Sequence, residues 1–209
     1  MAEQERMVSA EAGESQTIDG RRLRRERNIA AAVGAVVEMF EEEALTPTIE
    51  RAAERSGLSL RSVYRYFPDP ESLTQAAIDE LWRRGRPVSH LSDIGEGPFE
   101  SRVADFSAMR VRLYEQIGSG YRAGRLQAPK SAQIREDLDR TRRALTDQFE
   151  LQFRQELDAL RPEIRMQRRH AADVMSQLDA IDLLRRARRL TVQETIDVVA
   201  DAIRVALTA

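Results

Sequence analysis

The chain has 209 residues, with 33 basic and 35 acidic side chains and a net charge of −2 at pH 7. This balance excludes a protein whose whole surface coats a polyanion, because that class needs a large positive charge. No cysteine is present, which excludes disulfides, thiolate metal sites and cysteine nucleophiles. Hydrophobic residues make up 42% and charged residues 33%, the composition of a globular protein able to bury a core.

The first twenty residues are polar and carry five acidic side chains against one arginine. They lack the basic start and apolar run of a secretory signal, and we predict a disordered leader over residues 1–20. The longest apolar run, residues 29–37, is far shorter than a membrane span. We therefore expect a cytoplasmic protein with no membrane partner.

A basic cluster follows, with five arginines and one glutamate in residues 21–27. Cations at a helix N-terminus oppose the helix dipole and cost stability, whereas a nearby phosphate backbone reverses the sign. Apolar residues then recur at helical spacing as far as Phe40, so the pattern predicts a helix over residues 23–43. A solvated helix entry is the alternative interpretation; we favour phosphate contact, with Arg24 and Arg25 as candidates.

Residues 48–67 read as a helix, a tight turn and a second helix. Thr48 can cap a helix over residues 49–55 that Gly57 ends, and Ser59 can cap another over residues 60–67. Asp69-Pro70-Glu71 is a strong start signal for a helix that reaches about residue 84. The two short helices cannot be stable alone, so their neighbours must hold them.

A short helix held in this way can present its first turn to the major groove of DNA. Val63 and Phe67 are expected to point inward, while Arg61 and Arg65 lie one turn apart in a segment that contains no acid. Tyrosine hydroxyls suit phosphate oxygens. The predicted DNA-binding residues of this segment are Ser59, Leu60, Arg61, Ser62, Tyr64, Arg65 and Tyr66.

The second half is also helical, with helices expected near residues 99–117, 121–127, 131–160, 163–188 and 191–208 after a Gly/Pro-rich loop over 85–98. Apolar residues cover well over half the circumference of the last helix, more than packing against its own domain requires, so we expect a second apolar surface to cover it. An identical subunit related by symmetry is the simplest source of that surface. The predicted dimer interface is Leu178, Ile181, Ile196, Val199 and Ile203.

Residues 59–68, Ser-Leu-Arg-Ser-Val-Tyr-Arg-Tyr-Phe-Pro, followed by Glu71 and Leu73, resemble the DNA-binding domain of TetR-family transcriptional regulators. Phe40, Thr48-Ile49, Ala53 and Gly57-Leu58-Ser59 fit the same pattern, and the resemblance covers roughly residues 23–81. It implies a homodimer that binds a pseudo-palindromic operator, with Thr48 as a further DNA contact. Leu60 departs from the family, which often has a polar or basic reader there, and Pro70 replaces a frequent phosphate-binding lysine.

The helical pattern and the resemblance together predict an all-α protein with four parts: the disordered leader over residues 1–20, a three-helix helix-turn-helix domain over 21–68, a connecting helix over 69–84, and a larger ligand-binding and dimerisation domain over 85–209. The resemblance also implies an unidentified small-molecule effector, which we expect to be largely apolar and to release a repressor from DNA. Candidate lining residues, for each of which plain core packing is the alternative, are Phe106, Met109, Leu113, Tyr114, Phe149, Gln152, Phe153 and Met175. The connecting helix has no Gly or Pro between residues 71 and 84, so it can act as a stiff strut between the domains.

An enzyme and a scaffolding module are the two other function classes. His90 and His170 are the only histidines and have no partner at metal-ligand spacing, and no phosphate loop or nucleophile elbow occurs. We therefore expect no catalytic site, metal or cofactor. A helical interaction or scaffolding module that keeps the helix-turn-helix shape without specific DNA binding is the remaining alternative.

Overall fold

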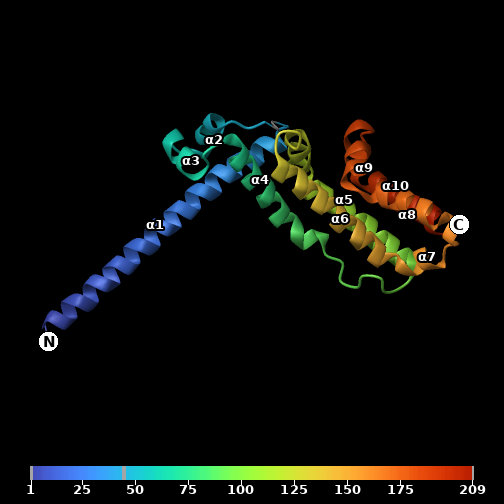
Figure 1. Ribbon diagram of the computed structural model, residues 1–209, viewed down its shortest axis with the longest axis horizontal. Helices are drawn as coiled ribbons and strands as arrows, with labels where there is room; N and C mark the ends of the chain where they lie inside the picture. Colours follow the sequence, from blue (N-terminus) through green and yellow to red (C-terminus); the bar gives the residue numbers. More distant parts are fainter. Residues whose placement is uncertain (1, 44–45, 209) are drawn as a thin grey trace. The chain divides into compact units, whose positions relative to one another are not determined.

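A computed structural model describes residues 2–43 and 46–208, with side chains from residue 20 onward. This part of the chain contains helices and no strand (Figure 1), which confirms the all-α class. The chain forms two compact units, Met1–Ala77 and Ile78–Ala209. The division falls inside helix α4 (Pro70–Gly85), whereas the sequence suggests a separate connecting segment over residues 69–84.

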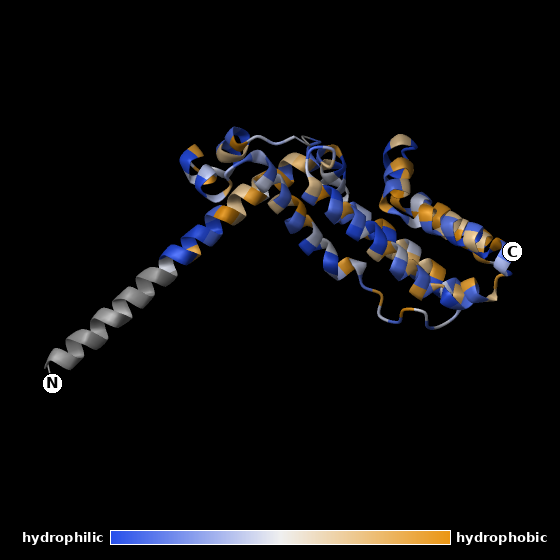
Figure 2. Cartoon of the chain, viewed as in Figure 1, coloured by the Kyte–Doolittle hydropathy of each residue, from blue (hydrophilic) through white to orange (hydrophobic). Residues whose placement is uncertain are grey.

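The first helix is longer than the sequence predicts. Helix α1 spans Ala2–Glu41, so its backbone includes residues 2–20, for which we predicted a disordered leader. This stretch is rich in Ala, Glu and Gln and has no proline, and such residues favour helix. Residue 1 and the side chains of residues 2–19 lie outside the described part of the chain. Figure 2 shows a hydrophilic stretch of α1 followed by an apolar one.

Helices α2 (Ile49–Ser56) and α3 (Leu60–Tyr66) form as predicted. The Thr48 hydroxyl accepts a hydrogen bond from the Arg51 backbone N–H at 3.3 Å. Gly57 ends α2 with φ of 68°, a left-handed conformation that glycine adopts without strain. The Ser59 hydroxyl accepts one from the Ser62 N–H at 3.2 Å. Each short helix is therefore stopped or started by the residue that the sequence indicated.

The core of the first unit joins α1, α2 and α3. Val63 is fully buried and Phe67 nearly so, which confirms that this side of α3 faces inward. They pack into a core with the other buried apolar side chains of the unit, which include Val36, Val37, Phe40, Ile49, Ala52 and Leu73. Helix α4 begins at Pro70, where the Asp69 carboxylate accepts a hydrogen bond from the Ser72 N–H at 2.7 Å.

A short 3₁₀ turn, η1 (Arg86–Ser89), follows α4, and helix α5 (Phe99–Gln127) is continuous. The sequence predicted a break near residues 118–120 because of two glycines, and this was wrong. Gly120 lies where α5 meets α4, and a Cβ atom there would overlap the buried Leu81 side chain. The glycine thus allows two helices to approach closely instead of ending one.

Two long predicted helices are interrupted. Residues 131–160 form α6 (Ala132–Gln152) and α7 (Arg154–Ala159), with a break at Phe153, where φ is −117° and ψ is 24°. The Phe153 ring is buried 5.2 Å from Phe106 and 5.1 Å from Phe149, measured between ring centroids. Burial of this aromatic cluster outweighs the helical continuity that the local sequence favours.

Residues 163–188 are likewise divided into α8 (Pro162–Ser176), α9 (Leu178–Asp182) and a π-helical turn, η2 (Leu183–Ala187). Gln177 is extended at the break, and its amide donates to Asp173 at 2.8 Å and to Thr146 at 3.1 Å. The last helix, α10 (Val192–Leu207), starts with a capping box between Thr191 and Glu194. Helix α5 contacts α6, α9 and α10, and α8 runs beside α10 (Figure 1).

One buried ion pair joins α5 to α7. Arg102 is 3% exposed, and its guanidinium binds the Glu156 carboxylate through both terminal nitrogens. It also donates to the carbonyl oxygens of Gln152 at 2.6 Å and Gly97 at 3.1 Å. Every nitrogen of this guanidinium therefore has an acceptor, as a buried charge requires.

We predict that Arg102→Met destabilises the protein by about 3–5 kcal/mol, because it leaves the Glu156 carboxylate without its partner in a largely buried position. Urea unfolding followed by circular dichroism measures the change. Arg102→Met combined with Glu156→Leu should recover much of the loss. A single variant as stable as the parent protein would contradict this account of the pair.

Candidate nucleic-acid interface

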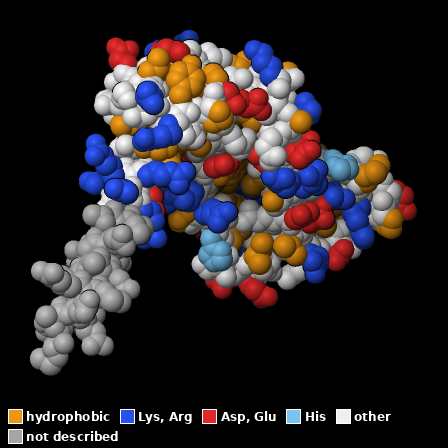
Figure 3. Space-filling model, turned by 60° about the vertical axis from the view of Figure 1, so that its left-hand side comes forward, with side chains coloured by type: hydrophobic (Ala, Val, Ile, Leu, Met, Phe, Trp, Pro, Cys, Tyr) orange, Lys and Arg blue, Asp and Glu red, His pale blue; other side chains and the backbone are white. Residues whose placement is uncertain are grey.

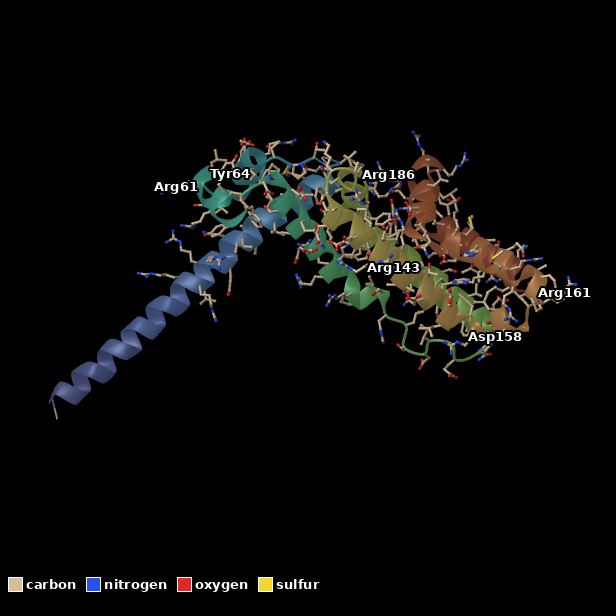
Figure 4. All side chains as sticks on the ribbon, viewed as in Figure 1. Arg61, Tyr64, Arg143, Asp158, Arg161 and Arg186 are labelled. Atoms are coloured by element: carbon tan, nitrogen blue, oxygen red, sulfur yellow. The ribbon has the colours of Figure 1, made fainter. Side chains whose placement is uncertain are left out.

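The outer face of α3 is open to solvent. Arg61, Arg65 and Ser59 are exposed, Leu60 is 43% and Tyr64 45% exposed, and Ser62 and Tyr66 are half-buried. Figure 4 shows Arg61 and Tyr64 on this helix. Arg61 has no hydrogen bond or ion pair among the described residues, so its guanidinium is available to an external acceptor. The first turn of α3 is thus presented in the way that groove recognition needs.

A basic cleft of about 610 Å³ lies between α1 and α3. We call it the arginine cleft; its lining residues are Arg21, Arg24, Arg25, Asn28, Ser62, Arg65 and Tyr66. No acidic residue is among them, and Figure 3 shows basic side chains gathered beside the grey N-terminal segment. Two basic stretches separated by some forty residues in the sequence therefore contribute to one surface, which suits a polyanion.

Tyr66 organises the wall of the arginine cleft. Its hydroxyl oxygen accepts from the Asn28 amide at 3.3 Å and from the Arg65 guanidinium at 2.6 Å, and Arg65 also lies over the Tyr66 ring at 4.9 Å. These donors, Asn28 first and Arg65 second, hold the pKa of Tyr66 below its ordinary value. Because the hydroxyl accepts both bonds, its own proton remains available to an outside acceptor such as a phosphate oxygen.

Tyr64 has a partner that the sequence did not indicate. Its hydroxyl donates to the Glu50 carboxylate of α2 at 3.3 Å, so an acid lies beside a helix whose own segment contains none. The pKa of Glu50 is lowered first by a hydrogen bond from its own backbone N–H and then by Thr48, which keeps the carboxylate charged. A phosphate contact by Tyr64 would have to displace this bond.

Sequence reasoning missed two residues of this surface, Asn28 and Glu50. A signal existed for Asn28, because residues 21, 24, 25 and 28 share one helical face. None existed for Glu50, since its contact with Tyr64 depends on how α2 packs against α3. Thr48 is exposed at the start of α2, Arg24 and Arg25 are exposed on α1, and their role in DNA binding stays a prediction.

The predicted ligand-lining residues fill the core of the second unit. Seven are buried: Phe106, Met109, Leu113, Tyr114, Phe149, Gln152 and Phe153; Met175 is half-buried. The Tyr114 hydroxyl donates to Asp182 at 2.6 Å, and the Gln152 side-chain oxygen accepts from the Gly95 N–H at 2.8 Å. These two polar groups therefore serve the fold.

A separate cleft of about 490 Å³ occurs in the second unit, and Gln152 is the one predicted ligand residue among those that line it. The rest of its lining comes from residues 90–93 and 96–97 of the loop and from Ser101, Arg102, Asp105 and Arg112 of α5. The lining is mostly polar and charged, unlike the largely apolar site that the sequence suggested.

The predicted dimer residues also lie inside their own unit. Leu178, Ile181, Val199 and Ile203 have no exposed surface, and Ile196 is half-buried, because α9 and α10 pack against α5 and α8 packs against both of them. A partner subunit could not touch the four buried side chains. The exposed apolar residues of α8 and α10 are different ones: Met166 (63%), Val174 (58%), Val192 (38%) and Val205 (69%).

Neither a metal site nor a membrane span is found in the described residues. No group of three or more His, Asp or Glu side chains in this part of the chain could hold a metal ion. Among its helices, none combines the length and the apolar character needed to cross a bilayer.

Comparison with known proteins places the fold. No protein-family model matches the chain, and no curated protein is similar in sequence. A TetR-family transcriptional regulator from Streptomyces coelicolor superposes with a TM-score of 0.65 at 18% identity, covering 87% of this chain and 79% of its own. A protein from Pseudomonas aeruginosa PAO1, named a transcriptional regulator, gives 0.62 at 12% identity, covering 90% and 92%.

A third structure, named a TetR-family regulator and from Rhodococcus sp., gives a TM-score of 0.58 at 16% identity and covers 88% of this chain and 98% of its own. All three likenesses extend over both units of the chain. The chain therefore has the fold of TetR-family transcriptional regulators, as its sequence suggested.

We predict that Tyr66 ionises at lower pH than an ordinary tyrosine, because Asn28 and Arg65 donate hydrogen bonds that stabilise the phenolate. Ultraviolet absorbance during an alkaline titration measures the ionisation. Tyr66→Phe should remove the earliest phase, whereas Tyr64→Phe should leave it in place. An unchanged titration curve in Tyr66→Phe would contradict the described bonds.

Proposed function

We propose that this protein is a transcriptional regulator that binds a pseudo-palindromic operator as a homodimer, with one α3 helix from each subunit in a major groove. The arginine cleft beside the exposed first turn of α3 carries the proposal, since it offers phosphate contacts next to a groove-reading helix. The TetR fold supports it.

Within the interface, Arg61 is the base reader. Its unpaired guanidinium can bind the guanine O6 and N7 acceptors, and the exposed Leu60 can contact a thymine methyl group. Arg24, Arg25, Arg65 and Tyr66 are phosphate-binding residues around the arginine cleft. Thr48, Ser59, Ser62 and Tyr64 complete the surface, with Tyr64 released from Glu50 when DNA binds.

The dimer forms through the exposed stripes of α8 and α10. Met166 and Val174 lie on α8, Val205 lies on α10, and all three are more than half exposed. Since α8 runs beside α10, these side chains can form one apolar face that a second copy covers. This face replaces the buried residues that the sequence favoured.

Regulation passes through α4, which belongs to both units and is uninterrupted from Pro70 to Gly85. Its C-terminal half packs on α5 through Leu81 and Gly120. A ligand that changes the packing of α5 can therefore change the distance between the two α3 helices of the dimer. The size of this shift in the conformational equilibrium is limited by the difference between the ligand's affinities for the two conformations. We propose a repressor that a small molecule releases from its operator.

The scaffolding alternative is supported in the sequence by Leu60 and Pro70. The structure adds the pairing of Tyr64 with Glu50, which places a negative charge next to α3. DNA binding decides between the two functions. An operator obtained by selection from random duplexes should bind with steep salt dependence, because each phosphate contact releases counterions. Failure to select any sequence would favour the scaffold.

We predict that Arg61→Ala with Arg65→Ala weakens operator binding by about 2–6 kcal/mol and flattens the salt dependence, because a base contact and a phosphate contact are lost. Fluorescence anisotropy against the selected operator measures both. The matched control is Arg143→Ala with Arg161→Ala, which removes the same charge from exposed positions on α6 and at the start of α8 (Figure 4). Equal losses in both variants would mean that α3 is not the reader.

We predict that Val205→Glu converts the dimer to a monomer, because it places a charge in the apolar face of α8 and α10. Sedimentation velocity measures the subunit state. Val192→Glu is the control, since Val192 is exposed at the first turn of the same helix, where an acid suits the helix dipole. A dimeric Val205→Glu would show that the subunits meet elsewhere.

A further inference from the structure

Helix α5 carries two buried arginines, and only one of them has an acceptor for every nitrogen of its guanidinium. Arg102 binds Glu156 and two carbonyl oxygens, as described above. Arg110 has no exposed surface, yet it makes a single hydrogen bond, from Nη2 to the Leu145 carbonyl oxygen at 2.5 Å. Its guanidinium stacks over the Phe106 ring at 4.6 Å, and its Nε and Nη1 atoms have no hydrogen-bond partner.

The acid whose charge acts on Arg110, Asp173, makes no hydrogen bond to it. Asp173 of α8 is buried, and its carboxylate oxygens accept from the Thr146 hydroxyl at 2.9 Å and from the Gln177 amide at 2.8 Å. Its charge favours the protonated form of Arg110, but burial dominates and lowers the pKa of Arg110 to about 9. At neutral pH the guanidinium therefore keeps its proton while two of its nitrogens are unpaired.

Further polar atoms in this region are also unsatisfied. The Ser107 hydroxyl, one helical turn before Arg110, is fully buried and has no partner, and neither does the side-chain oxygen of Gln177. Leaving a charge and two polar groups unpaired in a core costs stability. The fold supplies a carboxylate to Arg102 through Glu156 and gives Arg110 no hydrogen bond to one.

We propose that Arg110 and Ser107 bind the carboxylate of a small monocarboxylic acid whose apolar body packs against the neighbouring aromatic core. This inference rests on the proposed function, because it names the chemical class of the effector. The planar guanidinium matches a carboxylate, and the Ser107 hydroxyl can donate a second bond. The Phe106 and Phe149 rings, 5.9 Å apart, give the apolar body its surroundings.

The surroundings of Arg110 limit the charge of the ligand. Because the Asp173 carboxylate is already buried in this core, each further negative charge adds to the cost of burial, and a phosphate dianion costs more than a monocarboxylate. Because Arg110 has no exposed surface, a ligand reaches it only when the packing of α5 against α6 loosens. Ligand binding is thereby linked to the position of α5, on which the C-terminal half of α4 rests.

The test measures thermal unfolding of the full chain with benzoate and hexanoate, each compared with its neutral amide and with equal sodium chloride. At tenfold excess over Kd, a bound acid raises Tm by about 3–6 °C. We expect at least one acid to raise Tm more than its amide does, and this extra rise in Tm to vanish in Arg110→Met. Equal shifts with acid and amide, or an equal Arg110-dependent shift with inorganic phosphate, would overturn the monocarboxylate assignment.

The variants separate a binding role from a structural one. Arg110→Met removes an unpaired buried charge, so Tm without ligand should stay the same or rise, whereas Arg102→Met should lower it. A fall as large as that of Arg102→Met would show that Arg110 is structural and overturn the inference. Arg110→Lys keeps the positive charge but lacks the planar guanidinium, so it should reduce the rise in Tm that the acid causes.

Operator binding, measured without added acid, distinguishes this inference from the proposed function. If the protein binds operator but no acid raises its Tm more than the matching amide does, the proposed effector class is contradicted and the proposed regulator function stands. If an acid gives the Arg110-dependent rise in Tm but the protein binds no operator, the ligand site stands and the proposed regulator function is contradicted. With both present, the acid should weaken operator binding in the parent protein and not in Arg110→Met.

Discussion

Helix α3 has seven residues, too few to remain helical in water by itself, and everything proposed for this protein depends on holding it in place. Burial of Val63 and Phe67 in the core of the first unit provides that hold. Since these two side chains define the inner face, the opposite face presents Arg61 and Arg65 to solvent. The caps at Ser59 and Gly57 then fix where the helix begins and how the chain enters it.

The second unit is organised around α5, and its polar side chains make α5 an unusual core helix. Tyr114 and Tyr121 donate to Asp182 and Asp179, which fastens α9 to α5, and burial is the largest cause that raises their pKa values. Arg102 fastens α7. Against this background, Arg110 and Ser107 stand out, because the helix that pairs Arg102, Tyr114 and Tyr121 leaves polar atoms of these two side chains without a partner.

The features of the first unit were largely predictable from the sequence, because they are local. Caps, a left-handed glycine and a proline at the first helical position act within four residues, so Thr48, Gly57, Ser59 and Pro70 mark helix ends correctly. The second unit was predicted less well. Phe153 and Gln177 break helices for reasons of tertiary packing, and Gly120 continues one for the same reason.

The net charge of −2 hides a division along the chain that the sequence by itself already determined: acidic residues before position 20, then five arginines in residues 21–27, then two more on α3. It also determined the all-α class and the inward face of α3, since these follow from spacing and propensity. Only the tertiary structure decided that the two basic stretches meet in one cleft with Asn28 and Tyr66, that Glu50 faces Tyr64, and that Arg110 is buried without a hydrogen bond to an acid. Contacts between residues far apart in the sequence depend on how helices pack, and helical periodicity carries no record of that packing.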